Sequence, residues 1–186
     1  RSPSAYRSYL TRLQEISRRL IRFDKPTIAA INGYALGSGY ELALACDLRI
    51  ASEDAQIGSP EAKVTSSVTG GALRLLQDLV GPGKARELLF TGRYIDGREA
   101  AQIGLINKAV PLKNLMPEAL ALAEQISQNA SISLKMIKKG LLIAQGEASL
   151  EALMDFEVEA CLACVATKER EASLAAFETR KEKAKS

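Results

Sequence analysis

The sequence predicts an α/β fold followed by a helical region, and three observations lead to this prediction. The run Thr27–Ile31 is continuously apolar and rich in β-branched residues, as expected of a strand covered on both faces. Glycine turns and short helical segments alternate with two further strand-like stretches, 47–51 and 106–110. From Asn114 onward nearly every segment has helical periodicity. No linker rich in proline, glycine or serine separates the two parts of this 186-residue chain.

The first expected element is an amphipathic helix that ends before Pro26, because a proline pushes the preceding residue out of the helical region. Arg1 to Lys25 carry seven basic and two acidic residues, whereas the whole chain has a net charge of only +3. The basic side could attract phosphate groups of a nucleotide-like ligand or of RNA, or it could simply be a solvated face. The helical wheel places on the apolar side Tyr6, Tyr9, Leu10, Leu13, Ile16, Leu20 and Ile21, and on the basic side Arg7, Arg12, Arg18, Arg19 and Arg22.

The remaining elements are predicted from glycine, proline and capping residues that begin or end regular structure. After the first strand the glycines interrupt regular structure, and a short helix is expected from Glu41 to Cys46, followed by the strand 47–51. Ser59, Pro60 and Glu61 have the pattern of the N-cap and the first two residues of another helix. Breaks between the later helical segments are expected at 81–83, 96–97 and 128–131 and near Gly146.

Composition excludes several classes of chemistry. With 47% hydrophobic and 25% charged residues, the chain has a globular rather than a disordered composition. It contains no histidine, so no Ser-His-Asp or Cys-His nucleophile, no histidine metal ligand and no histidine acid or base can operate within it. Proton chemistry must therefore use Asp, Glu, Lys, Tyr or Cys. Because no apolar run approaches membrane-spanning length, no membrane partner is expected.

Three cysteines do not make a disulfide framework, which favours a reducing compartment. Cys161 and Cys164 form a CxxC, but no second pair follows at the spacing of a zinc finger. Both fall on an apolar stripe with helical spacing, so we interpret them as core residues rather than as a redox or metal site, and no metal site is predicted. The other members of this stripe are Leu150, Leu153, Met154, Val158, Leu162 and Val165.

The glycine cluster after the first strand matches neither of two phosphate-binding motifs. Gly37-Ser38-Gly39 is followed by Leu42, where the dinucleotide fingerprint needs a small residue. Gly83-Lys84 is followed by Ala85 instead of the serine or threonine of a P-loop. What remains is a strand, a glycine turn and a helix N-terminus, whose backbone N–H groups can hold an anion or a developing oxyanion.

Two acidic residues lie at predicted helix starts, and each has two interpretations. Ser38 and Glu41 fit a capping box, in which Glu41 reaches back to the Ser38 N–H. If that N–H instead stabilises an oxyanion, Glu41 cannot hold it at the moment of reaction, so the two interpretations exclude each other. Glu61 could simply be a favourable carboxylate in a first helical turn. These residues alone leave the alternatives open.

The stretch from Lys25 to Ser52 reads KPTIAAINGYALGSGYELALACDLRIAS. It resembles the signature of the crotonase superfamily, the enoyl-CoA hydratases and isomerases, which typically reads KPxIAAxxGxAxGGGxELAxxCDxRxA. The following family element, GxPE, is matched by Gly58 to Glu61. Further similarity is found in Leu89 to Gly92, Ala100 to Ile106 and Ala176-Phe177.

The resemblance implies a crotonase-like spiral of ββα units that binds an acyl-CoA thioester, followed by a C-terminal helical region. On this pattern, residues 1–110 are the C-terminal part of the spiral core and 111–186 are a helical region of the trimerisation type. The catalytic residues would be Glu41 and Glu61, which together hold a water so that one removes its proton and the other delivers a proton to the α-carbon. The backbone N–H of Ser38 would be one oxyanion-hole donor. The implied substrate-binding positions are Ala35, Leu36, Gly37 and Pro60.

The implied activity is that of an enoyl-CoA hydratase, a lyase that adds water across the 2,3-double bond of an acyl-CoA. Isomerases of the family need mainly the second acid, so the presence of both favours hydration, and an isomerase or another CoA-thioester enzyme is the alternative. An RNA-binding or structural member of the fold is an alternative of another class, motivated by the basic helix. Clp-type proteases share the fold but need a histidine and are excluded. No separate cofactor is expected, because coenzyme A is part of the substrate.

The chain departs from the family pattern in two places. The family usually has an LGxxPGxGG run after the second acid, whereas Val64 to Gly71 is one residue shorter and lacks proline, and this loop shapes the acyl pocket. The family also has strands and helices ahead of the basic helix, including the segment with the other oxyanion N–H, so the second donor is expected outside this chain. Family habit predicts a homotrimer or a pair of trimers. The expected location is the cytoplasm, or the mitochondrial matrix of a eukaryote.

Overall fold

The computed structural model describes residues 3–64 and 66–146, together with the single positions 156, 158, 159, 163 and 167. The chain divides into two units, each with its own set of internal contacts. The first unit consists of Arg1–Phe23 and Thr27–Ala121, and the second consists of Asp24–Pro26 and Leu122–Ser186.

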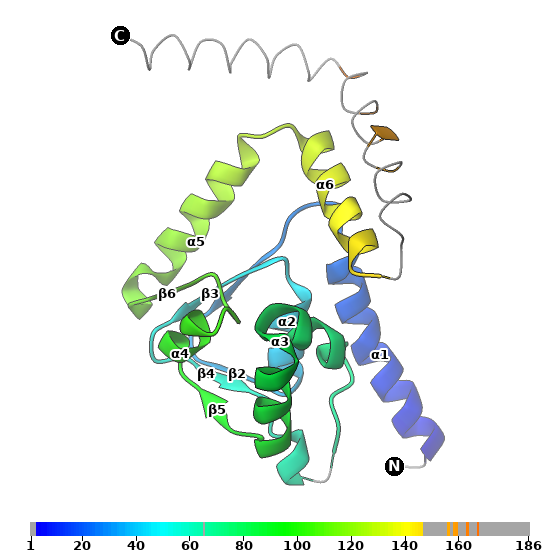
Figure 1. Cartoon of the computed structure of the whole chain (residues 1–186), viewed down its shortest axis with the longest axis vertical. Coiled ribbons are helices and arrows are strands. Elements are labelled where there is room, and N and C mark those ends of the chain that lie inside the picture. The colour runs from blue at the N-terminus through cyan, green and yellow to red at the C-terminus, as the bar shows by residue number, and fades with distance from the viewer. Residues whose placement is uncertain are drawn as a thin grey trace. The chain divides into compact units, whose positions relative to one another are not determined.

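In the first unit the order strand, strand, helix occurs twice in succession (Figure 1). Its elements are α1 (Pro3–Ile21), β1 (Ile28–Ile31), β2 (Tyr34–Leu36), α2 (Ser38–Ala45), β3 (Leu48–Ser52), β4 (Gln56–Gly58), the 3-10 helix η1 (Glu61–Val64), α3 (Ala72–Thr91), β5 (Tyr94–Ile95), α4 (Gly97–Gln102), β6 (Lys108–Val110) and the first part of α5 (Leu112–Ser127). The first repeat is therefore β1, β2 and α2, and the second is β3, β4 and the helices η1 and α3.

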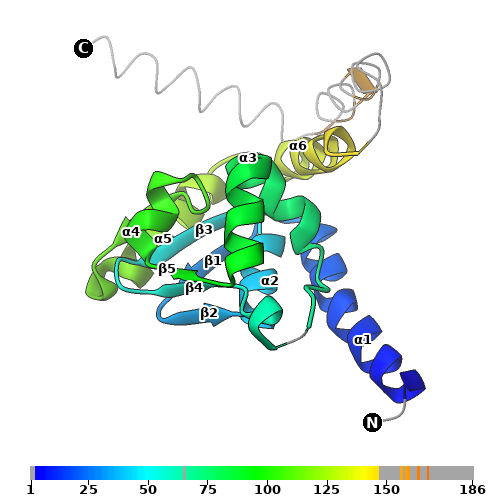
Figure 2. The same cartoon turned by 60° about the horizontal axis from the view of Figure 1, so that its bottom comes forward.

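Equivalent strands of the two repeats pair with each other in parallel, and this pairing generates the spiral (Figure 2). One sheet has the order β1-β3-β6, with Ala30 opposite Ile50. The other has the order β2-β4-β5, in which β4 and β5 are antiparallel and Ile57 lies opposite Ile95. The α/β class and the expected spiral of ββα units are confirmed.

The sequence predicted β1, β3 and β6 but not β2, β4 or β5. The stretches Thr27–Ile31 and 47–51 form β1 and β3, while only the second half of 106–110 is a strand, β6. β2, β4 and β5 have three, three and two residues, too few for an alternation of apolar and polar side chains to appear. They form because they pair with one another across the repeats.

Small side chains let the helices approach the sheets closely in the core of the first unit. Ala51, Ala72 and Ala100 have no exposed surface. The closest approach is at Gly97 in the first turn of α4, where a Cβ atom would lie 2.0 Å from the carbonyl oxygen of Ser52. The larger side chains of the same core include Ile31, Leu44, Ile57, Leu76, Leu88 and Leu105.

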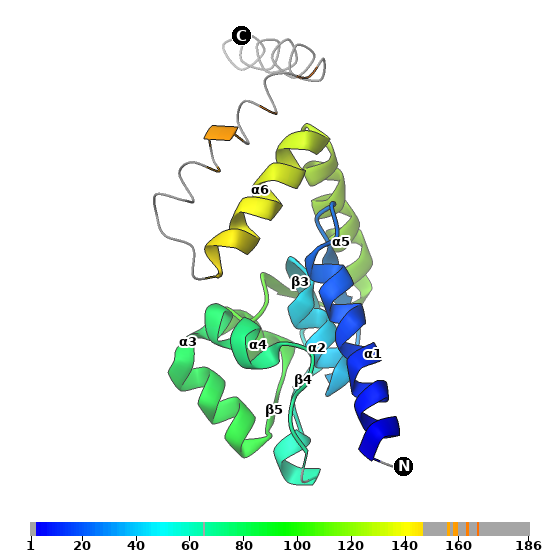
Figure 3. The same ribbon diagram turned by 90° about the vertical axis from the view of Figure 1, so that its right-hand side faces the viewer.

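The predicted amphipathic helix is present as α1 and packs against α2 (Figure 3). All five arginines of its predicted basic side are exposed, as expected of a solvated face. The apolar side is less regular than predicted, because Ile16 is 48% exposed and the most buried residue is Ser17, at 4%. The side chain of Tyr6 lies outside the described part of the structure. α1 therefore directs a polar residue, as well as apolar ones, toward the interior of the unit.

Three of the predicted breaks are present, and two of them have clear local causes. Gly81 interrupts α3 with a φ of 75° and a ψ of 163°, and Pro82 begins the turn that follows. Asp96 is the N-cap of α4, and its side chain accepts a hydrogen bond of 2.8 Å from the N–H of Glu99. α5 ends at Ser127, which agrees with the break predicted at 128–131.

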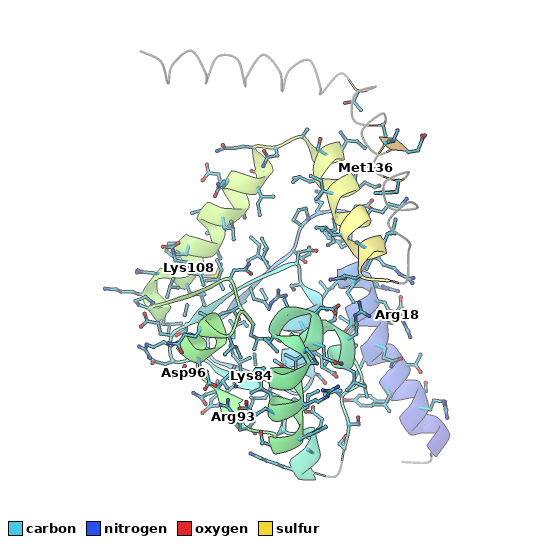
Figure 4. The ribbon with its side chains drawn as sticks, viewed as in Figure 1. Arg18, Lys84, Arg93, Asp96, Lys108 and Met136 are labelled. Carbon is cyan, nitrogen blue, oxygen red and sulfur yellow. The ribbon has the colours of Figure 1, made fainter. Side chains whose placement is uncertain are left out.

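An exposed ion network joins α3 to α4. Lys84 and Arg93 both donate to Glu87, at 2.5 and 2.7 Å, and Arg93 also donates to Glu99 at 2.6 Å (Figure 4). Hydrogen bonds from Lys84 and Arg93 lower the pKa of Glu87. Because these groups are exposed to solvent, the network contributes little to stability.

The second unit contains the end of α5, α6 (Ser131–Ala144) and the segment 24–26. Lys135 on α6 pairs with Asp24 at 2.7 Å, and Lys138 donates to the carbonyl oxygen of Lys25 at 3.0 Å. Among the described residues, no helix combines the length and the apolar character needed to cross a membrane.

Several predictions for the C-terminal part cannot be compared with the structure. Val158 is a described member of the predicted apolar stripe and is 58% exposed. Cys161 and Cys164 lie outside the described residues, as does Ala176-Phe177. The division into 1–110 and 111–186 stays a prediction.

Arg49 on β3 holds the C-terminal end of α2. Its side chain is buried, and its Nη1 donates to the carbonyl oxygens of Ala43 and Cys46 at 3.2 and 2.6 Å. Its Nε donates to the carbonyl oxygen of Leu105 at 2.9 Å. Burial lowers the pKa of Arg49, and the neighbouring Cys46 and Asp47 oppose this effect. A cation at this end is favourable because the last carbonyls of a helix lack partners and carry partial negative charge.

Replacing Arg49 by methionine should destabilise the first unit strongly. Methionine has a similar length but leaves the buried carbonyls that Arg49 binds without a donor. Because each unsatisfied buried acceptor costs about 1 to 3 kcal/mol, we expect the free energy of unfolding to fall by about 3 to 5 kcal/mol in a denaturant titration. Arg98→Met is the control, since Arg98 is exposed and pairs with two loop carboxylates, and its effect should be much smaller. Equal losses in the two variants would contradict the role of Arg49.

Candidate active site

α2 begins at a turn whose backbone conformation requires glycine. Gly37 is the N-cap residue, with a φ of 53° and a ψ of −121°, and its N–H donates to the carbonyl oxygen of Gly58 at 3.2 Å. Ser38 is the first helical residue and is exposed, and no described residue provides an acceptor for its N–H. The first N–H groups of a helix have no acceptor within the helix. The start of α2 therefore offers a backbone donor at the surface.

Glu41 directs its carboxylate to the loop that precedes α3. Its Oε1 accepts hydrogen bonds from the N–H groups of Thr69 and Gly70 at 2.5 and 2.8 Å, and its Oε2 accepts one from the Thr69 hydroxyl at 3.3 Å. Of the two interpretations of Ser38 and Glu41, the capping box is therefore wrong: the N-cap is Gly37, and no side chain caps the helix. The loop before α3 offers Glu41 two backbone donors, which replace the single N–H of a capping box. As a result the Ser38 N–H is not occupied by Glu41.

The helix predicted to begin at Ser59, Pro60 and Glu61 does not form as an α-helix. The segment forms the single turn η1, in which the N–H of Lys63 donates to the carbonyl oxygen of Pro60 at 2.8 Å. The Ser59 hydroxyl donates to Oε2 of Glu61 instead of accepting from a backbone N–H. This bond fixes one oxygen of the Glu61 carboxylate.

The two glutamates border the same turn of the chain. A Cβ atom on Gly37 would lie 3.0 Å from Oε1 of Glu61, so this carboxylate rests directly against the residue that starts α2. Glu41 belongs to the first turn of the same helix and is only 4% exposed. The structure thus brings Glu41, Glu61 and the free N–H of Ser38 to one end of α2, where the predicted roles require them.

Two residues of α1 support the loop that holds Glu41. Nε2 of Gln14 donates to the carbonyl oxygen of Thr69 at 2.9 Å. Gly70 has no room for a side chain, because a Cβ atom there would lie 2.9 Å from the Cβ of Glu41 and 3.0 Å from Oγ of Ser17. The position of the Glu41 carboxylate therefore depends on α1 through this loop.

Tyr40 is a buried phenol next to the site. It is 2% exposed, and burial raises its pKa, an effect to which the charge of Glu61 adds and which Arg49 opposes. The phenol is therefore neutral at physiological pH. The charge of Glu61 acts on this phenol, so the two side chains are within electrostatic range of each other. Tyr40 directly precedes Glu41 in the first turn of α2.

The other predicted binding positions differ in how they can reach a ligand. The methyl group of Ala35 belongs to the core, so this residue can contact a ligand only through its backbone. Leu36, Gly37 and Pro60 are half-buried at the end of β2 and the start of η1. Their roles stay predictions. Among the described residues, no group of three acidic or cysteine side chains is arranged to hold a metal ion.

Thr69, Gln14, Tyr40 and Ser59 border the predicted catalytic residues, and sequence reasoning gave none of them a role at the site. Thr69 carries the one available signal, because it lies in the loop that departs from the family pattern, directly before Gly70. Gln14 reaches the loop only through the packing of α1 against it, and the bond from Ser59 to Glu61 forms because η1 replaces the expected α-helix. Local sequence therefore contains nothing that marks them.

Comparison with known proteins shows the family to which the chain belongs. The family model described as enoyl-CoA hydratase/isomerase matches residues 1–186. The short-chain-enoyl-CoA hydratase of Clostridium acetobutylicum is 39% identical over 88% of this chain and 62% of its own length. The crotonyl-CoA hydratase of Syntrophomonas wolfei is 37% identical over 88% of this chain and 63% of its own length. The chain thus spans less than two thirds of the length of these two curated relatives.

A solved structure extends the similarity to three dimensions. The enoyl-CoA hydratase from Bacillus anthracis superposes with a TM-score of 0.91 at 34% identity, over 97% of this chain and 69% of that one. A probable enoyl-CoA hydratase/isomerase from Mycobacterium abscessus gives a TM-score of 0.91 at 32% identity. The family match over the whole chain, together with a spiral that places two glutamates beside one helix start, shows that the chain belongs to the enoyl-CoA hydratase/isomerase family of the crotonase superfamily.

Proposed function

We propose that the protein is an enoyl-CoA hydratase that adds water across the 2,3-double bond of a short unsaturated acyl-CoA. The observation that carries the proposal is the convergence of two carboxylates and an unoccupied backbone N–H at the start of α2, in a chain without histidine. The names of the two curated relatives support a short acyl chain. The reaction would use no separate cofactor, since carboxylates can both take and return the proton that hydration requires.

In this mechanism the thioester carbonyl oxygen accepts a hydrogen bond from the Ser38 N–H. Negative charge grows on that oxygen as water attacks the β-carbon, and the positive end of the α2 dipole stabilises it together with the N–H. One of the two glutamates takes a proton from the water while the other supplies a proton to the α-carbon. The new C–O and C–H bonds replace the double bond, so atoms and charge balance without another reactant.

An isomerase that shifts the double bond is the second candidate. Three hydrogen bonds already occupy the carboxylate of Glu41, whereas on Glu61 one comes from Ser59. A reaction that relies on Glu61 alone, moving a proton between two carbons of the acyl chain, would suit this difference. The two functions are separated by the effects of substitutions at the two glutamates.

The proposed assembly is a homotrimer or a pair of trimers. Supporting this proposal, α5 exposes apolar side chains at intervals of four residues, namely Leu112, Met116 and Leu120. Such a stripe is suited to burial against another subunit. The cytoplasm, or the matrix of a mitochondrion, is the proposed compartment, and the small number of cysteines supports it.

Substituting either glutamate by glutamine should nearly abolish hydration. In the complete protein we expect Glu41→Gln and Glu61→Gln each to lower kcat for crotonyl-CoA hydration by about 10² to 10⁴-fold, because each removes a proton acceptor or donor. The double variant should lose little more than the worse single variant, since both residues act on one water. The loss of absorbance of the conjugated thioester gives the rates, and Glu124→Gln on the exposed side of α5 is the control.

A hydration rate at the wild-type level in either single variant would contradict the two-glutamate mechanism. If Glu41→Gln keeps double-bond shifting while Glu61→Gln loses it, the isomerase takes the place of the hydratase. The same samples answer both questions when shifting of a 3-enoyl-CoA is assayed beside hydration.

Replacing Gly70 by alanine should displace Glu41 without changing any group that takes part in the reaction. The added methyl would press against the Cβ of Glu41 at 2.9 Å, and a misplacement of about 1 Å can lower a rate on the order of 10²-fold. We expect such a loss in kcat, with a folded protein as judged by circular dichroism. Gly83→Ala is the control, because that helical position has no atom within 4 Å of the added Cβ. Similar rates for the two variants would show that the loop does not position Glu41.

A further inference from the structure

The loop in which this chain departs from the family pattern supplies all three hydrogen bonds to the Glu41 carboxylate. Thr69 provides two of them, one from its N–H and one from its hydroxyl, and Gly70 provides the third. The shortened loop therefore does more at this site than line an acyl chain. It determines how the carboxylate is rotated about its last bond.

The hydrogen bonds make the two oxygens of Glu41 unequal. A carboxylate has about four acceptor positions, two on each oxygen. Oε1 receives two backbone N–H groups at 2.5 and 2.8 Å, so both of its positions are filled by donors that cannot rotate away. Oε2 receives only the Thr69 hydroxyl at 3.3 Å, which leaves one position on that oxygen.

Thr69 is itself held from the other side. Gln14 on α1 donates to its carbonyl oxygen at 2.9 Å, and the next residue, Gly70, fits closely between Ser17 and Glu41. The backbone of Thr69 therefore has little freedom, and its hydroxyl is presented to Oε2 from a fixed point. A hydroxyl can still turn its hydrogen by rotation about the C–O bond.

We propose that Thr69 is a positioning residue whose hydroxyl fixes the rotation of the Glu41 carboxylate, so that Oε1 is the anchored oxygen and Oε2 is the oxygen that binds the reacting water. The proposal rests on the proposed hydratase function. Thr69 does not touch the acyl group and acts only through Glu41. When Oε2 takes a proton from the water, the Thr69 hydroxyl turns its hydrogen away, while the two N–H groups continue to hold Oε1.

The test compares Thr69→Val with Thr69→Ser in the complete protein. Valine has nearly the same shape as threonine but no hydroxyl, and serine keeps the hydroxyl. We expect Thr69→Val to lower kcat for crotonyl-CoA hydration by about tenfold, with KM within about twofold, because a misrotated carboxylate affects the reacting water and not substrate binding. Thr69→Ser should recover most of the rate. Thr11→Val on α1 is the control, since the Thr11 hydroxyl bonds only to a local carbonyl on the exposed side.

A double-mutant cycle separates positioning from a general structural effect. In the background of Glu41→Gln, Thr69→Val should have no further effect on kcat if Thr69 acts through Glu41. The proposal is overturned if Thr69→Val hydrates at the wild-type rate, if Thr69→Ser is as slow as Thr69→Val, or if the tenfold loss persists in the Glu41→Gln background.

The cycle also distinguishes failure of this proposal from failure of the hydratase function. If the wild-type protein does not hydrate, the function is wrong and the same four proteins are compared by their free energies of unfolding. A coupling between the substitutions at Thr69 and Glu41 then supports the hydroxyl contact. Additive effects on stability would overturn it.

Discussion

The hydrogen bonds from the Arg49 guanidinium to the carbonyls at the end of α2 fix the helix on which the site is built. A short buried helix leaves unpaired groups at both ends, and only one end can be left for a ligand. In α2 the carbonyl end is closed by a buried cation, whereas the N–H end remains open at Ser38, beside Glu61. The negative end of the helix dipole is thus neutralised inside the unit, and the positive end is directed at the site.

The site lies where equivalent points of two successive repeats meet. The first repeat supplies the free N–H and Glu41 from the junction of β2 with α2, and the second supplies Glu61 from the junction of β4 with η1. The bond from the Gly37 N–H to the Gly58 carbonyl joins these junctions directly. Parallel pairing of β2 with β4 is therefore what brings two residues 20 positions apart in sequence to one turn of the backbone.

The features predicted correctly from local sequence are those that a single segment determines by itself. β1, β3 and the basic face of α1 appeared as expected, because long apolar runs and helical periodicity are properties of single segments. The candidate catalytic roles of Glu41 and Glu61 come from the resemblance and stay predictions. Of the two local interpretations of Glu41, the capping box is wrong, because a loop 28 positions away supplies two backbone donors. For the same reason Thr69 could not be recognised in advance. Its contact with Glu41 forms between separate elements, and the one signal in its own neighbourhood is that its loop departs from the family pattern.

The hydrogen bonds of Arg49, which hold the end of α2, also determine when the site can form. Arg49 is 56 positions from Leu105, whose carbonyl it binds, and its backbone N–H donates to Asn107, which is 58 positions away. Closing a loop of this length costs conformational entropy before the contact stabilises anything, and such non-local contacts slow folding. During synthesis, a nascent chain that ends before Leu105 must leave some of these hydrogen bonds unmade. The residues of α2 are therefore synthesised early, but the hydrogen bonds that hold α2 through Arg49 are completed only after Leu105 has been synthesised.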